Sequence, residues 1–165
     1  MIDVMMEGRK PGYRYQINRN AVRVTTGMLK AIDDVESLCS GWYPIFNKNN
    51  NSTEDNKRLQ ARLDSSDHPQ LKRLSDAVTR RILAETDWLT GRTQGTMNVI
   101  HSKPGCQRQH YHNDYEVRKH GSIPASVLVA LSKTSILVEG ARIRLDVGDM
   151  LFFEGYVTHA GDCFS

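Results

Sequence analysis

Hydrophobic residues recur at helical spacing in two segments of the first half of the chain. The earlier segment starts at Thr25 or Thr26, and either residue suits the N-cap of a helix. We expect this helix to end before Gly41. Its apolar stripe comprises Met28, Leu29, Ile32, Val35 and Leu38. The polar stretch that follows, 47–56, is rich in asparagine and predicts a loop.

The second segment predicts a helix that Asp67 caps and that has Pro69 in its first turn. We expect this helix to end near Gly91. Its apolar stripe comprises Leu71, Leu74, Val78 and Ile82, and Glu85 is a further candidate for the same face. Because an apolar stripe must be covered by another element, both helices are interpreted as scaffolding that packs against a second layer.

After Gly95 the pattern changes to short β-rich apolar runs that are separated by Gly, Pro and Asp turns. Such a pattern predicts a β-sandwich or jelly roll. The expected strands cover 97–101, 107–116, 126–131, 135–138, 141–145 and 150–153. The fold class is therefore expected to be mainly β with N-terminal helices (α+β).

The length of 165 residues predicts one domain. Within it, we expect residues 1–20 to form a flexible N-terminal extension. Residues 21–95 are expected to form a helical buttress, and residues 96–165 the β-core that the helices support.

Charge and cysteine content exclude several classes of partner. The chain carries 22 basic and 19 acidic residues, a net charge of +3, and its basic cluster lies in the expected extension, so no nucleic-acid partner is predicted. No apolar run reaches the roughly 18 residues of a membrane span, so no membrane partner is predicted. Three scattered cysteines do not suit a disulfide framework, which favours a reducing, cytoplasmic location.

The candidate chemistry lies in a segment rich in histidine. If this segment is extended, His110, His112, Asp114 and Glu116 point to one face. Burying this set without a counter-ion is costly, and a metal cation would remove the cost because it pairs with carboxylate and neutral imidazole. The alternative is an exposed face with solvated side chains.

A distant histidine extends the metal hypothesis. His159 follows the strand predicted at 150–153, and strands far apart in sequence lie side by side in a jelly roll. Two histidines and one carboxylate form a facial triad that leaves coordination positions open at Fe(II). The alternative is that His159 is an ordinary core or surface histidine.

The segment 102–115, with His112 and Asp114 two residues apart, resembles the metal-binding segment of Fe(II)- and 2-oxoglutarate-dependent dioxygenases, nearest to the phytanoyl-CoA dioxygenase-like branch. The stretch 145–161 resembles the strand pair that carries this family's distal histidine, which assigns His159 as the third ligand. The resemblance implies a double-stranded β-helix (jelly roll) over residues 96–165. It also implies Fe(II), 2-oxoglutarate as cosubstrate, and hydroxylation of an unidentified small molecule or side chain.

Binding of the cosubstrate raises a further question. Gln109 reaches a bound cosubstrate only if the strand kinks there. The family places an arginine or lysine for the far carboxylate of 2-oxoglutarate on its last core strand, after the distal histidine. That strand is expected to be absent, so the C-terminal end of the jelly roll is expected to be incomplete. Arg142 and Arg144 are alternatives for this role, although their alternation with apolar residues is typical of exposed strand positions.

Two other interpretations remain open. A resemblance to the cupin motifs would assign the metal to His110, His112, Glu116 and His159 instead of Asp114. Both families share the double-stranded β-helix, so the expected fold is the same. The third interpretation is a catalytically inactive jelly-roll binding module.

Overall fold

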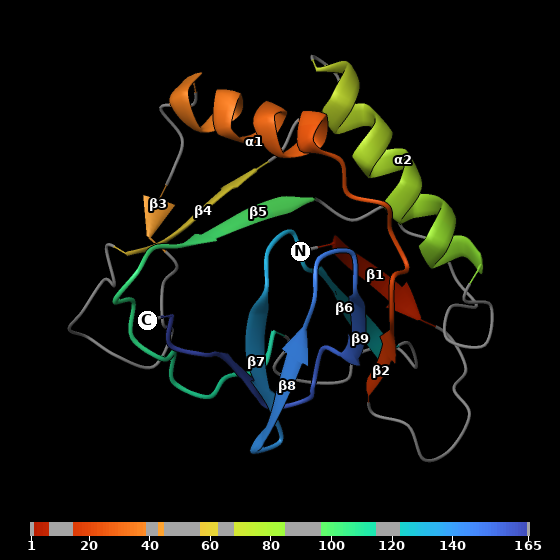
Figure 1. The fold of residues 1–165 in the computed structure, drawn as a ribbon. Coiled ribbons are helices and arrows are strands. Elements are labelled where there is room, and N and C mark those ends of the chain that lie inside the picture. The colour runs from red at the N-terminus through yellow and green to blue at the C-terminus, as the bar shows by residue number, and fades with distance from the viewer. Residues whose placement is uncertain are drawn as a thin grey trace.

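The structure is a computed structural model. It describes residues 2–6, 15–38, 43–44, 57–62, 68–84, 97–114 and 123–164. In these ranges the chain is mainly β with two helices, as the sequence pattern predicts, and Figure 1 shows both helices on one side of the β-structure. Neither of the helices in the described ranges has the length and apolar character needed to cross a membrane.

The first helix, α1 (Thr26–Leu38), begins where the pattern predicts. The hydroxyl of Thr25 accepts a hydrogen bond from the backbone N–H of Met28 at 3.3 Å, which makes Thr25 the N-cap. Met28, Ala31 and Ile32 are buried, so this face of α1 packs on the core.

The second helix, α2 (Pro69–Ala84), buries the apolar residues of its predicted stripe, Leu71, Leu74, Val78 and Ile82, whereas Glu85 lies outside the described residues. Its first turn is closed by His68, whose Nδ1 accepts from the backbone N–H of Gln70 at 3.3 Å. Asp67, the predicted cap, and Gly91, the predicted end, lie outside the described residues.

The largest sheet is antiparallel and has four strands. In spatial order, these are β1 (Ile2–Met6), β6 (Ile123–Val129), β9 (Met150–Glu154) and β2 (Tyr15–Asn18). Alternate residues of β9 enter two different cores. Met150 and Phe152 pack with the helices, whereas Leu151 and Phe153 pack with residues of a three-stranded sheet formed by 134–138, 141–145 and 159–161. β9 is therefore buried on both faces, and the helices cover one of them.

The presence of β1 and β2 differs from the expectation that residues 1–20 form a flexible extension. β1 pairs with β6, with Ile2 opposite Val127, and β2 pairs with β9, with Ile17 opposite Leu151. Strands of five and four residues are too short to show a clear hydrophobic period. Their partners lie more than a hundred residues away, so no local pattern announces the pairing.

Two three-stranded antiparallel sheets complete the described β-structure. One contains β10 (His159–Gly161), β7 (Thr134–Val138) and β8 (Ala141–Leu145) in that order. The other contains β3 (Tyr43–Pro44), β4 (Arg58–Arg62) and β5 (Asn98–Ser102). The strands predicted at 97–101, 126–131, 135–138, 141–145 and 150–153 correspond to β5, β6, β7, β8 and β9.

A tight turn before β9 requires glycine at position 148. Gly148 has a φ of +87°, and a Cβ there would lie 2.3 Å from the backbone oxygen of Val22. The backbones also bond, because the N–H of Val22 donates to the carbonyl of Gly148 at 3.0 Å. The turn therefore joins the start of β9 to the chain between β2 and α1.

Asp149 ties the same turn to the end of β2. Its buried carboxylate accepts hydrogen bonds from the backbone N–H groups of Asn20 and Asp146, both at 2.9 Å, and from Arg19 at 2.5 Å. Burial raises the pKa of Asp149, but these hydrogen bonds and the Arg19 charge outweigh it and hold the pKa below its ordinary value.

Candidate metal centre

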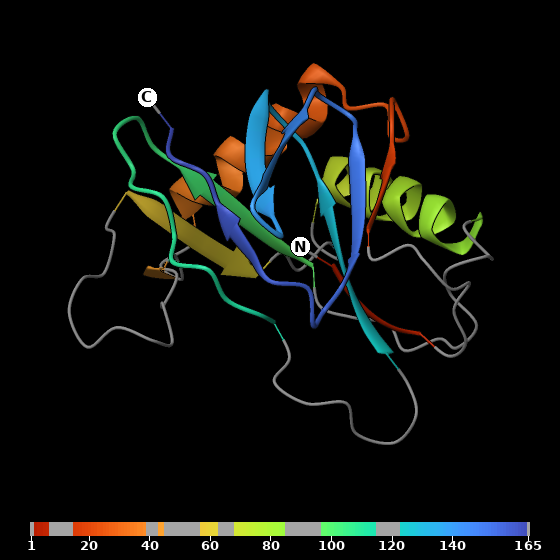
Figure 2. The same ribbon diagram turned by 90° about the horizontal axis from the view of Figure 1, so that it is seen from below.

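The histidine-rich segment, of which residues 107–114 are described, runs alongside β10 as an irregular chain (Figure 2). A regular strand was predicted at 107–116, whereas the described part, up to 114, makes only isolated bridges. His112 and His159 each donate a backbone N–H to the other's carbonyl at 2.9 Å, and the N–H of Gln109 donates to the carbonyl of Gly161 at 2.9 Å. The segment therefore acts as an additional edge beside β10.

The two histidine side chains share one face of this edge. Residues directly opposite each other in an antiparallel pair project to the same side. The ring centroids of His112 and His159 accordingly lie 4.5 Å apart, and the ring of Phe153 packs on His159 at 4.6 Å. His159 is almost fully buried, whereas His112 is half-buried.

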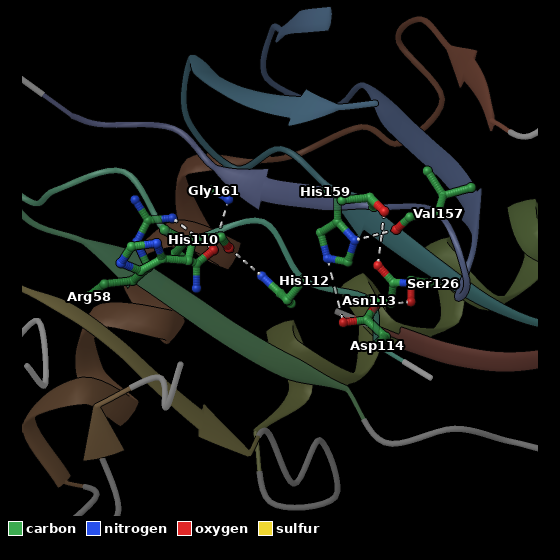
Figure 3. A network of polar contacts seen from close by, with 11 residues as sticks. Arg58, His110, His112, Asn113, Asp114, Ser126, Val157, His159 and Gly161 are labelled. Carbon is green, nitrogen blue, oxygen red and sulfur yellow. Dashed lines mark hydrogen bonds and ion pairs between the residues drawn. The ribbon is translucent and has the colours of Figure 1, made fainter. Parts of the chain in front are cut away.

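Both imidazoles are held in the same tautomer by the backbone. The Nδ1 atom of His112 lies 2.9 Å from the carbonyl oxygen of His110, and that of His159 lies 2.9 Å from the carbonyl oxygen of Val157 (Figure 3). Because a carbonyl oxygen only accepts, Nδ1 is the donor in both rings. The Nε2 atoms are then left to act as acceptors or metal ligands.

The Nε2 atom of His159 makes no hydrogen bond although it is buried. It faces Oδ1 of Asp114 at a distance of 3.5 Å. The other oxygen of Asp114, Oδ2, accepts a hydrogen bond from the hydroxyl of Ser126. A lone pair that faces a carboxylate in a buried place requires either a proton or a metal cation between them.

The pKa values reflect this arrangement. Burial is the main cause that lowers the pKa of His112. Burial acts in the same direction on His159, but the close contact with the Asp114 carboxylate and its negative charge outweigh burial and raise the pKa of His159. Burial raises the pKa of Asp114, but its contacts with His159 and Ser126 outweigh this and lower it. Asp114 is therefore a carboxylate at neutral pH, and it attracts a cation.

The three residues predicted as metal ligands lie together. One donor atom from each of His112, Asp114 and His159 lies within 4.8 Å of the others. His110 is not part of this cluster: its residue is exposed, and its carbonyl oxygen lies 2.9 Å from Nδ1 of His112. Glu116, the carboxylate that a cupin-type site would require, lies outside the described residues.

The cluster opens into a cavity of about 1090 Å³. Side chains from β4, β5, β7, β10 and the histidine-rich segment line it. Gln109 also lines the cavity. The segment is irregular at Gln109, and an irregular strand is the condition under which we expect Gln109 to reach a cosubstrate. Its Oε1 accepts from the backbone N–H of Gly161 at 2.8 Å.

Two arginines that the sequence offered for a ligand carboxylate do not line this cavity. Arg142 forms an ion pair with Asp162 at 2.7 Å, and Arg144 is exposed on β8. A third arginine, Arg58 on β4, does line the cavity and is buried. Sequence analysis missed Arg58, because an arginine at the start of a short strand is ordinarily exposed.

No protein-family model matches the sequence, and no curated protein matches it. Among solved structures, the fold is similar to that of a prolyl-4-hydroxylase from Pseudomonas putida. The TM-score is 0.62 at 13% sequence identity, and the match covers 90% of this chain and 84% of that chain. At this identity the likeness concerns the fold, and it does not single out the phytanoyl-CoA dioxygenase-like branch. The chain therefore has the fold of a protein described as a prolyl-4-hydroxylase, with a His-Asp-His cluster on its cavity wall.

Proposed function

We propose that this chain is a non-haem Fe(II)- and 2-oxoglutarate-dependent dioxygenase built on a double-stranded β-helix. His112, Asp114 and His159 are its metal ligands in this proposal. The observation that carries it is the buried Nε2 of His159, which has no hydrogen-bond partner and faces the Asp114 carboxylate beside His112. The fold likeness to a protein described as a prolyl-4-hydroxylase supports the same conclusion.

The donor set favours iron. Two imidazoles and one carboxylate suit an Fe(II) centre that keeps positions open for other ligands. When bound, Fe(II) together with 2-oxoglutarate and dioxygen supplies the oxidising chemistry. The Nε2 atom of His159 has no hydrogen-bond partner, and Asp114 beside it carries one negative charge. A divalent cation suits this pair of groups better than a proton does.

The protein's own residues perform three tasks at this centre. The carbonyls of His110 and Val157 fix the two imidazoles with Nε2 directed at the metal position. The hydroxyl of Ser126 orients the Asp114 carboxylate. The ring of Phe153 covers His159 on one side and keeps water away from it. The substrate, a small molecule or a side chain, is selected elsewhere in the cavity.

The test is anaerobic Fe(II) binding by calorimetry, with and without 2-oxoglutarate. We expect wild type to bind Fe(II) and 2-oxoglutarate to tighten the binding. Asp114→Asn should weaken Fe(II) binding by more than the roughly 10- to 100-fold that loss of a second-layer partner causes. Asp76→Asn, on the exposed side of α2, is the control and should bind as wild type does.

Three results would contradict the proposal. Fe(II) binding that survives in Asp114→Asn but is lost in Glu116→Gln would indicate a cupin-type site. Binding of neither Fe(II) nor 2-oxoglutarate by the folded wild-type protein would indicate an inactive jelly-roll module. Fe(II) binding that 2-oxoglutarate leaves unchanged would exclude this cosubstrate.

A further inference from the structure

Arg58 places a buried positive charge on the wall of the cavity. Arg58 lines this cavity, and only 5% of the residue is exposed to solvent. Nη2 donates to the carbonyls of Gln107, at 3.2 Å, and Asp162, and it contacts Sγ of Cys106 at 3.3 Å. Nη1 donates to Oε1 of Gln109 at 3.4 Å, and Nε is buried with no partner. All of these acceptors are uncharged.

No carboxylate of the described residues forms an ion pair with Arg58. Asp162 is adjacent to Arg58 through its carbonyl oxygen, but its carboxylate is engaged by Arg142 at 2.7 Å and by the hydroxyl of Ser135 at 2.7 Å. A buried charge without a counter-ion is costly, and buried charges in proteins are ordinarily paired with a charge of opposite sign. Arg58 therefore leaves a positive potential in the cavity that an anionic ligand would satisfy.

Gly161 shows where the guanidinium lies relative to the metal cluster. A Cβ at position 161 would lie 1.6 Å from Nη1 of Arg58, so the guanidinium occupies the space of the missing side chain. Residues 159 and 161 project to the same face of a strand, roughly 6.7 Å apart. The guanidinium of Arg58 therefore lies on the same face as the imidazole of His159, one side-chain step along β10. Figure 3 shows Arg58 and Gly161 on one side of His112, and His159 and Asp114 on the other.

Two donors are available at this position. Nη1 of Arg58 makes one long contact, to Oε1 of Gln109, and retains a second N–H. Oε1 of Gln109 is held by Gly161 and Arg58, which leaves its Nε2 amide as a donor on the cavity wall. A guanidinium beside an amide N–H suits one carboxylate, through charge-assisted hydrogen bonds.

We propose that Arg58, together with Gln109, binds the far carboxylate of 2-oxoglutarate while the keto-acid end of that molecule lies at the His112–Asp114–His159 cluster. This inference rests on the proposed function. One side-chain step along β10 is a span that a five-carbon dicarboxylate covers. The cation reaches the cavity from β4, which lies before the metal ligands in the chain, and not from a strand after the distal histidine. Gly161 is a positioning residue in this arrangement, because only a residue without a side chain admits Arg58.

The experiment compares two ligands on the anaerobic Fe(II)-loaded protein by calorimetry. 2-Oxopentanoate matches 2-oxoglutarate in length but has a methyl group in place of the far carboxylate. We expect wild type to bind 2-oxoglutarate roughly 10- to 100-fold more tightly than 2-oxopentanoate, since a charge-assisted contact is lost. In Arg58→Gln this preference should fall to within about threefold, while Fe(II) affinity stays unchanged.

Further variants separate the role of Arg58 from a purely structural one. Gly161→Ala retains Arg58 but displaces it, so the preference should also be lost. Arg142→Gln removes an arginine of the same neighbourhood that does not line the cavity, and the preference should be retained. Circular dichroism verifies that each variant is folded. If Arg58→Gln fails to fold, folded Gly161→Ala decides instead, because it displaces the guanidinium without removing it.

The outcomes distinguish this inference from the proposed function. Equal affinity of Fe(II)-loaded wild type for the two ligands overturns the inference and leaves the metal site intact. A full preference that persists in folded Arg58→Gln also overturns it, and would indicate that Arg58 serves a substrate carboxylate instead. Failure of wild type to bind Fe(II) or either 2-oxo acid overturns the proposed function itself.

Discussion

The main chains of His112 and His159 hold each other through two reciprocal hydrogen bonds, each 2.9 Å long. The relative position of the two imidazoles is thus set by backbone pairing and does not depend on side-chain contacts alone. A second pair of backbone contacts, to the carbonyls of His110 and Val157, sets the rotation of each ring. The two nitrogen ligands are therefore pre-organised before any cation arrives, which reduces the entropic cost of binding.

We expect a divalent cation to stabilise the protein, because it would bind the folded cluster and not the unfolded chain. At a free Fe(II) concentration about 100 times the dissociation constant, the stabilisation is about 2.7 kcal/mol. For a domain of this size that corresponds to a rise in Tm of roughly 5–10 °C. Differential scanning fluorimetry under anaerobic conditions measures the shift, and a chelator should reverse it. Asp114→Asn should abolish the shift and Asp76→Asn should retain it.

Ser126 is expected to tune the metal affinity through Asp114. Ser126→Ala removes the hydroxyl that donates to Asp114, and we expect Fe(II) affinity to fall roughly 10- to 100-fold, as for other partners of ligating carboxylates. The measurement is a calorimetric titration. Ser135→Ala is the matched control, because it removes an equivalent hydroxyl from Asp162, which is not in the cluster. Equal losses in the two variants would show that the loss does not arise from the hydrogen bond to Asp114.

Asp149 should make folding stability depend on acid pH. Its pKa is lower in the folded state than in the unfolded chain, so its contribution is complete above the ordinary Asp pKa, about 3.9, and is lost as the pH falls through the folded value. Asp149→Asn should destabilise the protein by about 2–3 kcal/mol at pH 7, and this difference should shrink below about pH 4. Urea unfolding at several pH values measures it.

The control for this prediction lies in the same turn. The side chain of Asp146 is 70% exposed, and its distance from Lys133 is 3.9 Å. Exposed pairs of this kind contribute little, so Asp146→Asn should change stability by less than about 1 kcal/mol at either pH. A constant difference between wild type and Asp149→Asn across this pH range would contradict the role assigned to Asp149.

A comparison of Gly148 with Gly140 separates two effects on stability, namely the close contact with Val22 and the positive φ angle. Both have positive φ, +87° and +84°, but a Cβ at position 148 meets the oxygen of Val22 at 2.3 Å, whereas one at 140 meets nothing within 4 Å. We expect Gly140→Ala to cost about 1 kcal/mol and Gly148→Ala at least about 3 kcal/mol. Urea unfolding compares them, and equal costs would exclude the contact with Val22 as the cause.

The elements with many regularly spaced apolar residues could be predicted from the sequence. The buried apolar face of α2 was predicted from the sequence, because its four apolar residues recur at helical spacing between Leu71 and Ile82 and so reveal the helical period. β2 could not be predicted in this way, because four residues such as Tyr15 to Asn18 show no distinguishable period. The histidine-rich segment was predicted as a strand, but its pairing beside β10 is limited to isolated bridges.

The residues of the candidate site also differ in whether the local sequence predicts them. His112 and Asp114 lie two residues apart, so local spacing announces them, and His159 follows a recognisable strand. Arg58 makes its contacts with residues 48 to 104 positions away, so nothing in its local sequence indicates that it is buried. Gly161 likewise has no visible role until the guanidinium above it is seen.

The pairing of β2 with β9 has a consequence for synthesis of the chain on the ribosome. Arg19, directly after β2, and Asp149, directly before β9, are 130 residues apart. At a translation rate of about 5–20 residues per second, β2 therefore waits roughly 7–25 s until β9 is made. During this time its hydrogen-bonding edge is open to other chains. The yield of native protein should therefore depend on translation speed and on chaperones that shield nascent strands. This dependence would be unrelated to the thermodynamic stability of the finished fold.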